Sequence, residues 1–553
     1  FEKKGEIVQL DDEYVWLDPA EIEAIEKRLK QKRKPGYLER LRGALTGEIE
    51  GAGVQVSGDI MEKLREISRE KEIPVPDDIR AELRPYQKRG YSWLMKNFRL
   101  GLGSLIADDM GLGKTLQVIT ALDELKREGE LKTGKVIAVV PATLLTNWVR
   151  EIRKFAPNLT AEIYHGSDRK LGDPDKRPDV LLTTYGTLRR DSEQLSKLSW
   201  RVMVMDEAQA VKNTGTGAYA AASSFPADRV IAMTGTPVEN RLMEYWSIFS
   251  IVQPGLLGTA SDFRENFSVP IENEHDPRAA EAFRKLVAPF MLRRMKTDKA
   301  IISDLPDCIV QDVMTTLLPE QAYLYQETLT RNLDAISRAE ANSRDKQVKR
   351  RALVLKLITE LKQICNSPSQ YNKQWSETPD SAKAETLFEL LDECRENGRK
   401  VLVFTQYREM GELLQGWIAK KTGRKPEFLH GGVSVARRAV MVDDFQNNPD
   451  SHILLVSLKA GGTGLNLTAA SVVIHYDLWW NPAVESQASD RAWRIGQQRD
   501  VLVYRFVTEG TFEERINEML TEKRRITDLA VSSGENWVGD MSTSELRALF
   551  SLS

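Results

Sequence analysis

The stretch GLGKT, residues 111–115, combines residue types that bind phosphate. Gly111 and Gly113 can take backbone conformations that turn successive N–H groups toward an anion. Lys114 can reach the β- and γ-phosphates of a nucleotide, and the Thr115 hydroxyl can ligate Mg²⁺. The apolar stretch SLIAD leads into this loop and a helical stretch follows it, so a helix N-terminus would also face the phosphates. The pattern predicts a nucleotide site, and the alternative is a chance glycine-rich turn.

One position departs from the usual phosphate-loop pattern, G-x-x-x-x-G-K-[ST]. Asp108 stands where that pattern has its first glycine. Aspartate favours turns because its side chain hydrogen-bonds its own downstream backbone N–H. The loop can therefore still form, and we count Asp108 among the nucleotide-binding residues.

A second candidate, RVMVMDEAQ, is an apolar strand that ends in two acids. Adjacent side chains on an extended chain point in different directions. Asp206 can therefore face a metal ion while Glu207 faces an attacking water as general base. The alternative for such a pair is a solvated strand end. The turn TGTP, 234–237, ends the next strand, and its hydroxyl groups could relay the state of the phosphates to whatever packs on it.

A third candidate, NPAVESQASDRAWRIGQQR, is predicted to form a helix from about Pro482. Gln487, Arg491 and Arg494 follow one another at four and three positions, so they would share one helix face. Two arginines with no acidic partner at that spacing favour an anion. They could reach across a cleft to the γ-phosphate as arginine fingers, which would make closure of the cleft depend on ATP. The alternative is a surface helix whose arginines extend into solvent.

Strands and helices must alternate to position these residues. From about 82 to 240 the strands are predicted at SLIAD, KVIAVVP, DVLLTT, RVMVMDEA and RVIAMTGTP. Near 400 the alternation resumes with KVLVFTQ, HILLVSL, SVVIHYD and VLVYRFV. Continuous runs of Val, Ile and Leu predict strands buried on both faces, and hence parallel α/β sheets. Residues 241–380 are predicted to be mostly helical, so the fold class is α/β, with a helical insert between two lobes.

This division gives the chain five predicted parts. They are an N-terminal appendage (1–80), a first lobe with the start of the insert (81–300), the helical insert (301–380), a second lobe (381–530) and a C-terminal tail (531–553). In the appendage, GEIVQLDDEYVWL predicts a short hairpin and DPAEIEAIEKRLKQKRK predicts a helix. Neither segment carries recognisable chemistry.

Composition limits the possible functions. The 553 residues are 41% hydrophobic and 29% charged, as in a soluble globular protein with several domains. The net charge of −3 means that any nucleic-acid surface must be local. The three cysteines form neither a C-x-x-C pair nor a disulfide framework, which favours a reducing compartment. No apolar run approaches the roughly 18 residues of a membrane span.

The chain begins at Phe1 and shows no secretory signal. We therefore expect an intracellular fragment of a longer protein, with further domains upstream. The location would be the cytoplasm or nucleoid if the source is prokaryotic.

Ten motifs in order carry a family resemblance. They are LRPYQKRGYSWL, DDMGLGKT, VVPATLLTNW, LTTYGTL, DEAQAVKN, TGTP, VLVFTQY, VSLKAGGTGLNLTAA, YDLWWNP and QASDRAWRIGQ. Over roughly 82–530 they resemble helicase superfamily two, and specifically its Swi/Snf-related DNA translocases. DMGLGKT, LKAGGTGLNL, WWNP and RIGQ point to this family rather than to RNA helicases. The family's loop resembles D-E-M-G-L-G-K-T, which accounts for Asp108. The short block between VLVFTQY and HGGVS fits the simpler prokaryotic-type members.

The resemblance implies two tandem RecA-like lobes with ATP and Mg²⁺ in the cleft between them. The residues that it implies for catalysis are Lys114, Glu207, Gln209, Arg491 and Arg494. Those for nucleotide binding are Arg84, Gln87, Asp108, Gly111, Gly113, Lys114, Thr115, Gly464 and Gln487. Those for the metal are Thr115 and Asp206. Those for the DNA backbone are Thr143, Trp148, Thr184, Tyr185, Lys459, Gly461 and Gly462. Gln209 and Trp493 stand where many members have histidine.

The implied function is ATP-dependent translocation along double-stranded DNA, which remodels or displaces protein–DNA complexes without separating the strands. Grip on the phosphate backbone predicts low sequence preference and high salt sensitivity. DNA-bound proteins are the expected further partners, and no membrane is expected. Two alternatives stay open: a strand-separating helicase on DNA or RNA, and a nucleotide switch that does no mechanical work.

Two smaller features also keep two interpretations. Trp479 and Trp480 either touch DNA or pack inside the second lobe. The basic cluster after the first lobe either assists DNA binding or is a solvated helix end. Its members are Arg293, Arg294, Lys296 and Lys299.

Overall fold

The computed structural model of this protein describes most of the chain. The described residues are 6–10, 13–17, 48–49, 52–53, 72–166, 168–172, 177–235, 242–296, 298–299, 301–302, 305–342, 346–458, 465–479, 481–526 and 543–552. The chain divides into two compact units, Phe1–Ser68 and Arg69–Ser553.

The first unit contains two short antiparallel strand pairs. Where the sequence predicted a hairpin, β1 (Glu6–Leu10) pairs with β2 (Glu13–Leu17). A second pair joins β3 (Glu48–Ile49) to β4 (Ala52–Gly53). The helix predicted over 18–34 lies outside the described residues.

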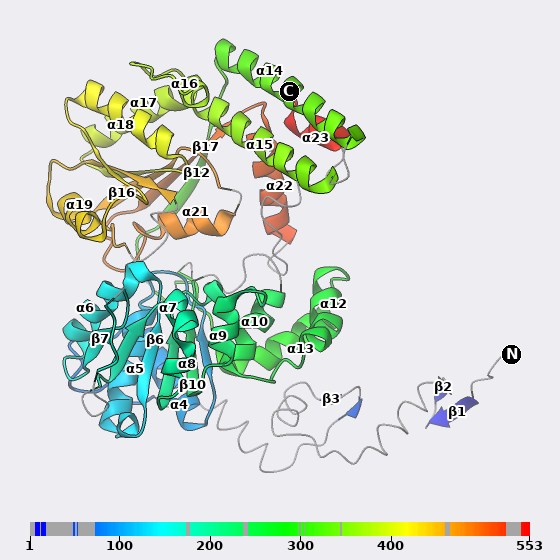
Figure 1. The fold of residues 1–553 in the computed structure, drawn as a ribbon, viewed down its shortest axis with the longest axis vertical. Coiled ribbons are helices and arrows are strands. Elements are labelled where there is room, and N and C mark those ends of the chain that lie inside the picture. The colour runs from blue at the N-terminus through cyan, green and yellow to red at the C-terminus, as the bar shows by residue number, and fades with distance from the viewer. Residues whose placement is uncertain are drawn as a thin grey trace. The chain divides into compact units, whose positions relative to one another are not determined.

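The first lobe of the larger unit is built on a seven-stranded parallel sheet with the order β11-β5-β10-β9-β6-β8-β7 (Figure 1). The strands are β5 (Ser104–Ile106), β6 (Lys135–Val139), β7 (Ala161–Ile163), β8 (Val180–Thr183), β9 (Trp200–Met205), β10 (Ala227–Met233) and β11 (Met291–Leu292). The five strands predicted from apolar runs are all present. The edge strands β7 and β11 carry partly exposed residues, so no buried run marked them.

Helices cover this sheet and bury its apolar side chains. They are α4 (Pro85–Arg99), α5 (Lys114–Arg127), α6 (Leu145–Phe155), α7 (Tyr185–Arg190), α8 (Ser192–Leu195), α9 (Gly217–Ser223) and α10 (Met243–Val252). Helices α11 (Ala260–Phe263), α12 (Val269–Glu272) and α13 (Pro277–Val287) follow, and Phe283 of α13 packs on Phe263 of α11 and on Tyr245 of α10. Val118 and Leu122 of α5 pack with Leu94 of α4 against the strands. The core also includes Ile79 and Leu83, so the lobe begins before the expected boundary at 81.

The second lobe has a six-stranded parallel sheet with the order β12-β17-β16-β13-β15-β14. The strands are β12 (Cys308–Thr315), β13 (Lys400–Thr405), β14 (Glu427–Leu429), β15 (Ile453–Ser457), β16 (Ala470–His475) and β17 (Val501–Thr508). Its helices are α17 (Ala382–Glu396), α18 (Arg408–Thr422), α19 (Val435–Asn447), α21 (Pro482–Ser489) and α22 (Phe512–Ile526). Two sheets of parallel strands with flanking helices confirm the predicted α/β class.

Strand β12 differs from the expected division of the chain. It falls in the range 301–380 that was predicted to be a helical insert, yet it pairs along its whole length with β17. Ile309, Val310 and Met314 are exposed on this edge strand, so the sequence shows no buried apolar run. The helical segment is therefore an insertion inside the second lobe, after its first strand.

The inserted helices form a small core of their own. Helices α14 (Pro319–Asn342) and α15 (Lys346–Asn366) lie near α22 and the C-terminal α23 (Thr543–Phe550), and the short α16 (Pro368–Asn372) packs on α15 (Figure 1). Tyr325 donates a hydrogen bond of 2.9 Å to the Phe550 carbonyl, and Leu546 packs in the same cluster. The end of the expected tail thus belongs to the packing of the insert.

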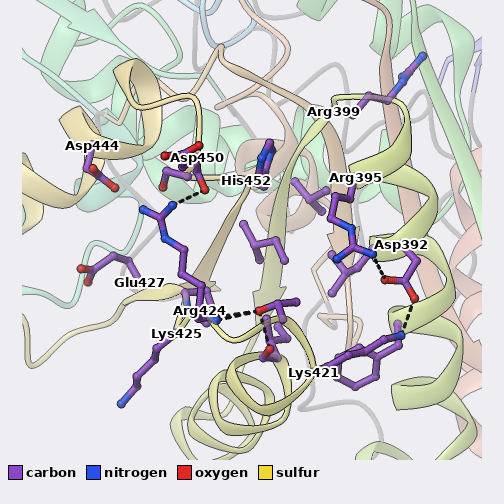
Figure 2. A pocket seen from close by; sticks show the side chains of 18 residues that line it. Asp392, Arg395, Arg399, Lys421, Arg424, Lys425, Glu427, Asp444, Asp450 and His452 are labelled. Carbon is purple, nitrogen blue, oxygen red and sulfur yellow. Dashed lines mark hydrogen bonds and ion pairs between the residues drawn. The ribbon is translucent and has the colours of Figure 1, made fainter.

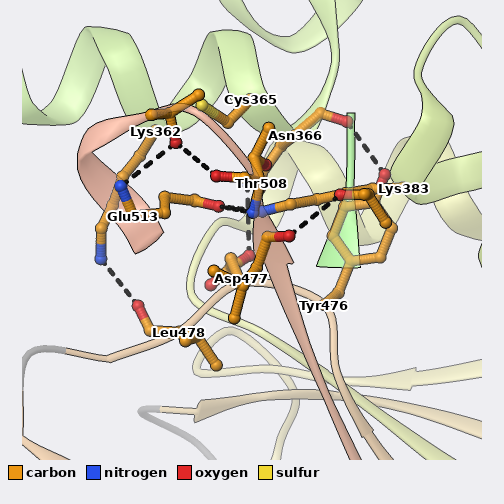
Figure 3. Close-up of polar contacts among 12 residues, drawn as sticks. Lys362, Cys365, Asn366, Lys383, Tyr476, Asp477, Leu478, Thr508 and Glu513 are labelled. Carbon is orange, nitrogen blue, oxygen red and sulfur yellow. Dashed lines mark hydrogen bonds and ion pairs between the residues drawn. The ribbon is translucent and has the colours of Figure 1, made fainter. Parts of the chain in front are cut away.

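A buried polar network joins the insert to the end of β16 (Figure 3). Lys362 donates to the Leu478 carbonyl at 2.7 Å, and Tyr476 donates to the Asn366 carbonyl at 2.9 Å. Lys383, only 1% exposed, pairs with Glu513 at 2.7 Å. Since buried ions and amides are costly without partners, this network fixes the loop that carries the DLWWNP motif.

Among the described residues, no helix is both long enough and apolar enough to cross a membrane. Cys308, Cys365 and Cys394 are all free thiols.

Candidate nucleotide site

The phosphate loop joins β5 to α5 at the carboxyl edge of the first sheet. Gly111 and Gly113 have φ values of 83° and 75°, in the left-handed region that glycine takes at no steric cost. The Lys114 ammonium donates to the carbonyls of Asp108 and Asp109 at 2.7 and 3.1 Å. Burial lowers the pKa of Lys114, and the nearby Glu207 carboxylate opposes that shift. The loop thus has the geometry of an anion site, with Lys114 and Thr115 in the first turn of α5.

Asp108 does not face this site. Its carboxylate is fully buried and accepts from Arg294, at 3.0 Å from Nε and through a second, shorter bond from Nη2. Arg294 also donates to Gln117 at 2.7 Å and to the Tyr86 carbonyl. The prediction that Asp108 binds nucleotide is therefore corrected: its side chain anchors the loop to the chain that leaves the lobe.

The structure divides the basic cluster. Arg294 and Lys296 are buried, so these two form neither a DNA-facing patch nor a solvated helix end, whereas Arg293 and Lys299 are exposed. A contact of the exposed pair with DNA stays a prediction. The predicted helix ends at Val287 because the chain turns into β11, which pairs with β5 beside the phosphate loop.

The start of α4 lies against the same loop. Gln87 donates to the Leu112 carbonyl at 3.1 Å and accepts from the Arg84 backbone N–H at 3.0 Å. The Tyr86 hydroxyl donates to the same Leu112 carbonyl at 2.9 Å. The structure therefore places Gln87 beside Gly113, where a side chain would meet the Gln87 amide, and Arg84 is bonded to Gln87 through its backbone. Their recognition of adenine stays a prediction.

Asp206 ends β9 and is held by two hydrogen bonds. One oxygen accepts from the Trp148 indole at 2.8 Å, and the other accepts from the Glu207 backbone N–H at 2.9 Å. Burial and the neighbouring Glu207 raise the pKa of Asp206 to about 7. A buried carboxylate with a raised pKa favours a cationic partner, as the predicted metal role requires.

The described geometry gives Trp148 and Tyr185 a role other than the predicted DNA contact. Trp148 is 1% exposed and bonds Asp206, while the buried Tyr185 hydroxyl donates to the Asp206 carbonyl at 2.8 Å. These two side chains are enclosed in the lobe, and a contact of Trp148 or Tyr185 with DNA stays a prediction. Both residues orient the strand end that carries the acids.

Glu207 has a backbone conformation that is uncommon for a residue with a side chain. Its φ and ψ are 49° and 55°, which is the left-handed region. Such strain is concentrated at functional sites, where the surrounding structure holds it in place. This turn changes the direction of the chain after β9. The Asp206 side chain therefore binds Trp148, whereas the Glu207 side chain binds Gln209.

A hydrogen-bond relay connects Glu207 to the third motif. The Gln209 amide donates to Glu207 at 2.8 Å, and Thr234 donates to the Gln209 oxygen at 2.8 Å. Gln209 thus donates through its amide nitrogen and accepts through its amide oxygen. A histidine, which many family members have at this position, can likewise donate with one ring nitrogen and accept with the other. The remainder of the TGTP turn, from 236, lies outside the described residues.

The arginine segment is a turn, in contrast to the predicted continuous helix. Helix α21 ends at Ser489. The Arg491 carbonyl accepts from the Leu467 backbone N–H at 3.0 Å, and Gln497 donates to the Ala492 carbonyl at 3.0 Å. One long-range bond and one local side-chain bond thus take carbonyls that a longer helix would have used.

Arg491 nevertheless faces the site from the second lobe. Its guanidinium is buried, with the residue 4% exposed, and Nε and Nη2 have no hydrogen-bond partner among the described residues. Burial lowers the pKa of Arg491 to about 10, while the Glu207 charge acts in the opposite direction. Arg494 lies beside the loop, since a Cβ added to Gly111 would lie 2.6 Å from the Arg494 Cβ. A buried guanidinium with open donors fits a phosphate in this site.

The remaining predicted residues are placed only in part. Gln487 lies in α21, and Thr184 caps α7 by accepting from the Thr187 N–H. The predicted positions that lie outside the described residues are Lys459, Gly461, Gly462 and Gly464, together with Trp480. The side chain of Thr143 lies outside them as well. Trp479 is partly buried against the core of the second lobe.

The residues present fit Mg²⁺ bound together with a nucleotide. Within the described part of the chain, no three His, Cys, Asp or Glu side chains gather as a metal cluster. Mg²⁺ on nucleotide phosphates needs only one or two protein oxygens, and keeps several waters. Thr115 and Asp206 are the candidate ligands.

A separate cavity of about 230 Å³ lies in the second lobe (Figure 2). Its lining includes Arg399, Glu427 and His452, which directly precede or begin β13, β14 and β15. These are the amino ends of parallel strands, whereas the motif residues follow the carboxyl ends. The cavity is therefore on the other edge of the sheet from the nucleotide site.

Two family models match the chain. The SNF2-related domain covers residues 86–370, and the helicase conserved C-terminal domain covers residues 382–496. The chain belongs to the SNF2-related family. Its two sheets are the tandem RecA-like lobes of that family's ATPase core, and the predicted resemblance is confirmed.

Individual relatives agree with this assignment. The chain is 37% identical to the Bacillus subtilis protein YwqA, named for ATP-dependent helicase or translocase activity, over 99% of this chain and 61% of the relative. It is 31% identical to the TATA-binding protein-associated factor MOT1 of Saccharomyces cerevisiae, over 89% of this chain and 30% of the relative. A solved Sulfolobus solfataricus SWI2/SNF2 ATPase core in complex with dsDNA is 39% identical, over 87% of this chain and all of that one, with a TM-score of 0.44. The chain thus spans about three fifths or less of the length of these two curated relatives.

Some functional residues gave no signal in the sequence. Arg294 meets Asp108 across 186 positions, and Trp148 meets Asp206 across 58. Neither separation corresponds to a helix or strand period. The roles of Arg294 and Trp148 are visible only in the structure, where each binds a buried acid.

Proposed function

We propose that this chain is the motor of an ATP-dependent double-stranded DNA translocase. One observation carries the proposal: the open, buried donors of Arg491 lie within the electrostatic influence of Glu207, and Arg494 of the same segment lies against Gly111 of the phosphate loop. Residues from both lobes therefore complete one site, and ATP can control how the lobes meet. The dsDNA in the solved Sulfolobus relative supports duplex DNA as the track.

The roles follow from the positions of the side chains. Lys114 and the loop N–H groups bind the phosphates, and Glu207 accepts the proton of the attacking water. Arg491 and Arg494 stabilise the charge that develops on the transferred phosphoryl group. Thr115 and Asp206 would hold Mg²⁺, which supplies further neutralisation of that charge when bound. Gln209 links the site to Thr234, and thereby to the next strand.

DNA is held through its phosphate backbone in this proposal. The candidate contacts are Thr143, Thr184, Lys459, Gly461 and Gly462. Each lobe keeps its grip while the other shifts, so the protein moves along the duplex and displaces or remodels what is bound there. The free thiols support a reducing, intracellular setting, in which DNA-bound proteins are the further partners.

The deciding experiment is the nucleic-acid dependence of ATP hydrolysis. We expect strong stimulation by duplex DNA, weaker stimulation by single-stranded DNA and none by RNA. The stimulation should fall steeply as salt is raised, because phosphate contacts release counterions. Equal stimulation by RNA would overturn the duplex assignment and favour a strand-separating helicase.

A triplex-displacement assay separates a motor from a switch. A translocase removes the third strand in an ATP-dependent manner and leaves the underlying duplex paired. Hydrolysis without displacement would favour a regulatory nucleotide switch. Separation of the duplex itself would favour the helicase alternative.

A further inference from the structure

Lys296 lies on the chain that connects the two lobes, four residues after β11. Its side chain is only 1% exposed. The ammonium donates to the Asp490 carboxylate at 2.7 Å and also donates to the Trp493 carbonyl. It lies 4.8 Å from the centre of the Trp493 ring as well, within the range of a cation–π contact.

These two partners directly precede the two arginines. Asp490 is followed by Arg491, and Trp493 is followed by Arg494. One ammonium group therefore ties down the residue before each arginine. A fixed point next to each one limits where its guanidinium can reach.

The backbone of Lys296 is bound to the phosphate loop at the same time. Its N–H donates to the Asp109 carboxylate at 2.9 Å, and the Asp109 N–H donates to the Arg294 carbonyl at 3.0 Å. The Asp109 carbonyl in turn accepts from Lys114. A single residue thus contacts the phosphate loop through its backbone and the arginine segment through its side chain.

We propose that Lys296 is a positioning residue that holds the arginine segment Asp490–Arg494 against the phosphate loop. In this role it acts through the two residues that its ammonium binds, Asp490 and Trp493. The inference rests on the proposed ATPase function, because it concerns how the arginines of that site are placed.

Other contacts keep the segment in the neighbourhood without this lysine. The Trp493 indole donates to the Pro306 carbonyl at 2.8 Å, and Leu305 packs with Tyr86 and Leu112 nearby. Loss of the ammonium should therefore leave a folded protein whose arginines are misplaced. Misplacement by about 1 Å can cost roughly 10²-fold in rate.

The test compares Lys296→Met and Lys296→Arg with wild type, by kcat and KM for ATP at saturating duplex DNA. Lys296→Met should lower kcat by about 10²-fold with KM nearly unchanged. Lys296→Arg keeps the charge and should restore much of the rate. The matched control is Lys285→Met, which removes an exposed lysine from a 2.8 Å pair with Glu281. It should leave both constants unchanged.

Two further variants keep the test decisive. Asp490→Asn removes the other charge with little change of shape, and should reproduce the kcat loss even if Lys296→Met folds poorly. Adding Lys296→Met to Arg491→Ala should cost less than it costs in wild type, because one of the arginines it positions is already gone.

Normal kcat in folded Lys296→Met, or full additivity with Arg491→Ala, would overturn the positioning role. A raised KM with normal kcat would also contradict it. In each of these outcomes wild type still hydrolyses ATP, so the proposed function would stand while the positioning role would not. Wild type that hydrolyses no ATP with any nucleic acid would instead overturn the proposed function itself.

Discussion

The carboxyl edges of the two sheets are built from the same kind of buried parallel strand but use their polar groups differently. At the first edge, Lys114, Asp206 and Glu207 converge on the nucleotide site. At the second edge, Lys383 pairs with Glu513, and Asp477 accepts from Thr405 and Gln406. The first set keeps binding capacity for a ligand, whereas the second set is paired mainly within the protein. The Arg491 guanidinium differs from the second set, because two of its donors, Nε and Nη2, remain open among the described residues.

The largest loss of ATPase activity is expected from a change at Arg491, the residue of the second lobe that faces the nucleotide site of the first. Arg491→Ala should lower kcat by about 10³–10⁵-fold, the usual value of an arginine finger. ATP affinity, measured with a fluorescent nucleotide, should stay near normal. The control is Arg437→Ala, which removes an exposed arginine of the same lobe that pairs with Glu427. Normal turnover by Arg491→Ala would show that the second lobe contributes no finger.

The next effect concerns the first edge alone. Glu207→Gln should lower kcat by about 10²–10⁴-fold, because the amide cannot accept the proton of the attacking water. ATP binding should persist, since the phosphate loop is untouched. Single-turnover hydrolysis of bound ATP measures this step directly. Substantial residual hydrolysis would remove Glu207 as the base.

A variant at the carboxyl edge of the second sheet should change the stability of the fold rather than the rate of ATP hydrolysis. Lys383→Met leaves Glu513 buried without its partner, and should lower the free energy of unfolding by about 3–5 kcal/mol. The double variant Lys383→Met/Glu513→Leu should recover most of that loss. Urea unfolding measures both, with ATPase activity per folded molecule as the companion reading. A large kcat loss in folded Lys383→Met would contradict the division between the two edges.

The smallest effect is an opposite pH response in the two lobes. In the second lobe, burial lowers the pKa of His475 to about 3, so the unfolded chain binds more protons than the folded one between pH 6.5 and 3. Stability from this group therefore falls as the pH falls through that range. In the first lobe the pKa of Asp206 is raised to about 7, so its contribution falls as the pH rises from about 4 to 7.

Each of these groups contributes a slope of at most about 1.4 kcal/mol per pH unit. Without nucleotide or Mg²⁺, His475→Gln should lose less stability than wild type between pH 6.5 and 5. Asp206→Asn should lose less than wild type between pH 5 and 7. Urea unfolding across this range measures both slopes. Slopes identical to wild type would mean that these groups do not titrate as described.

The sequence predicted what is local and periodic. The phosphate loop and nine of the strands followed from glycine positions and buried apolar runs. Strand β12 was missed because exposed Ile309 and Val310 make no buried pattern. The hydrogen bonds of Asp108 and Trp148 were not predicted, because their partners, Arg294 and Asp206, lie far away in the chain. Long-range side-chain partners leave no period to detect. After α21, one long-range bond and one local side-chain bond take carbonyls that a longer helix would have used.

Strand β12 also has a consequence for the order of synthesis. It lies on the N-terminal side of the inserted helices, but its neighbour β17 is made about 190 residues later, as the 193-residue separation of Asp312 and Arg505 shows. A growing chain therefore carries an unpaired strand with apolar side chains for many seconds, at a translation rate of roughly 5–20 residues per second. Such an edge invites pairing with other chains. In the first lobe β5 is also made well before its partners, because Ser104 pairs with Ile231 of β10 and Leu105 pairs with Met291 of β11.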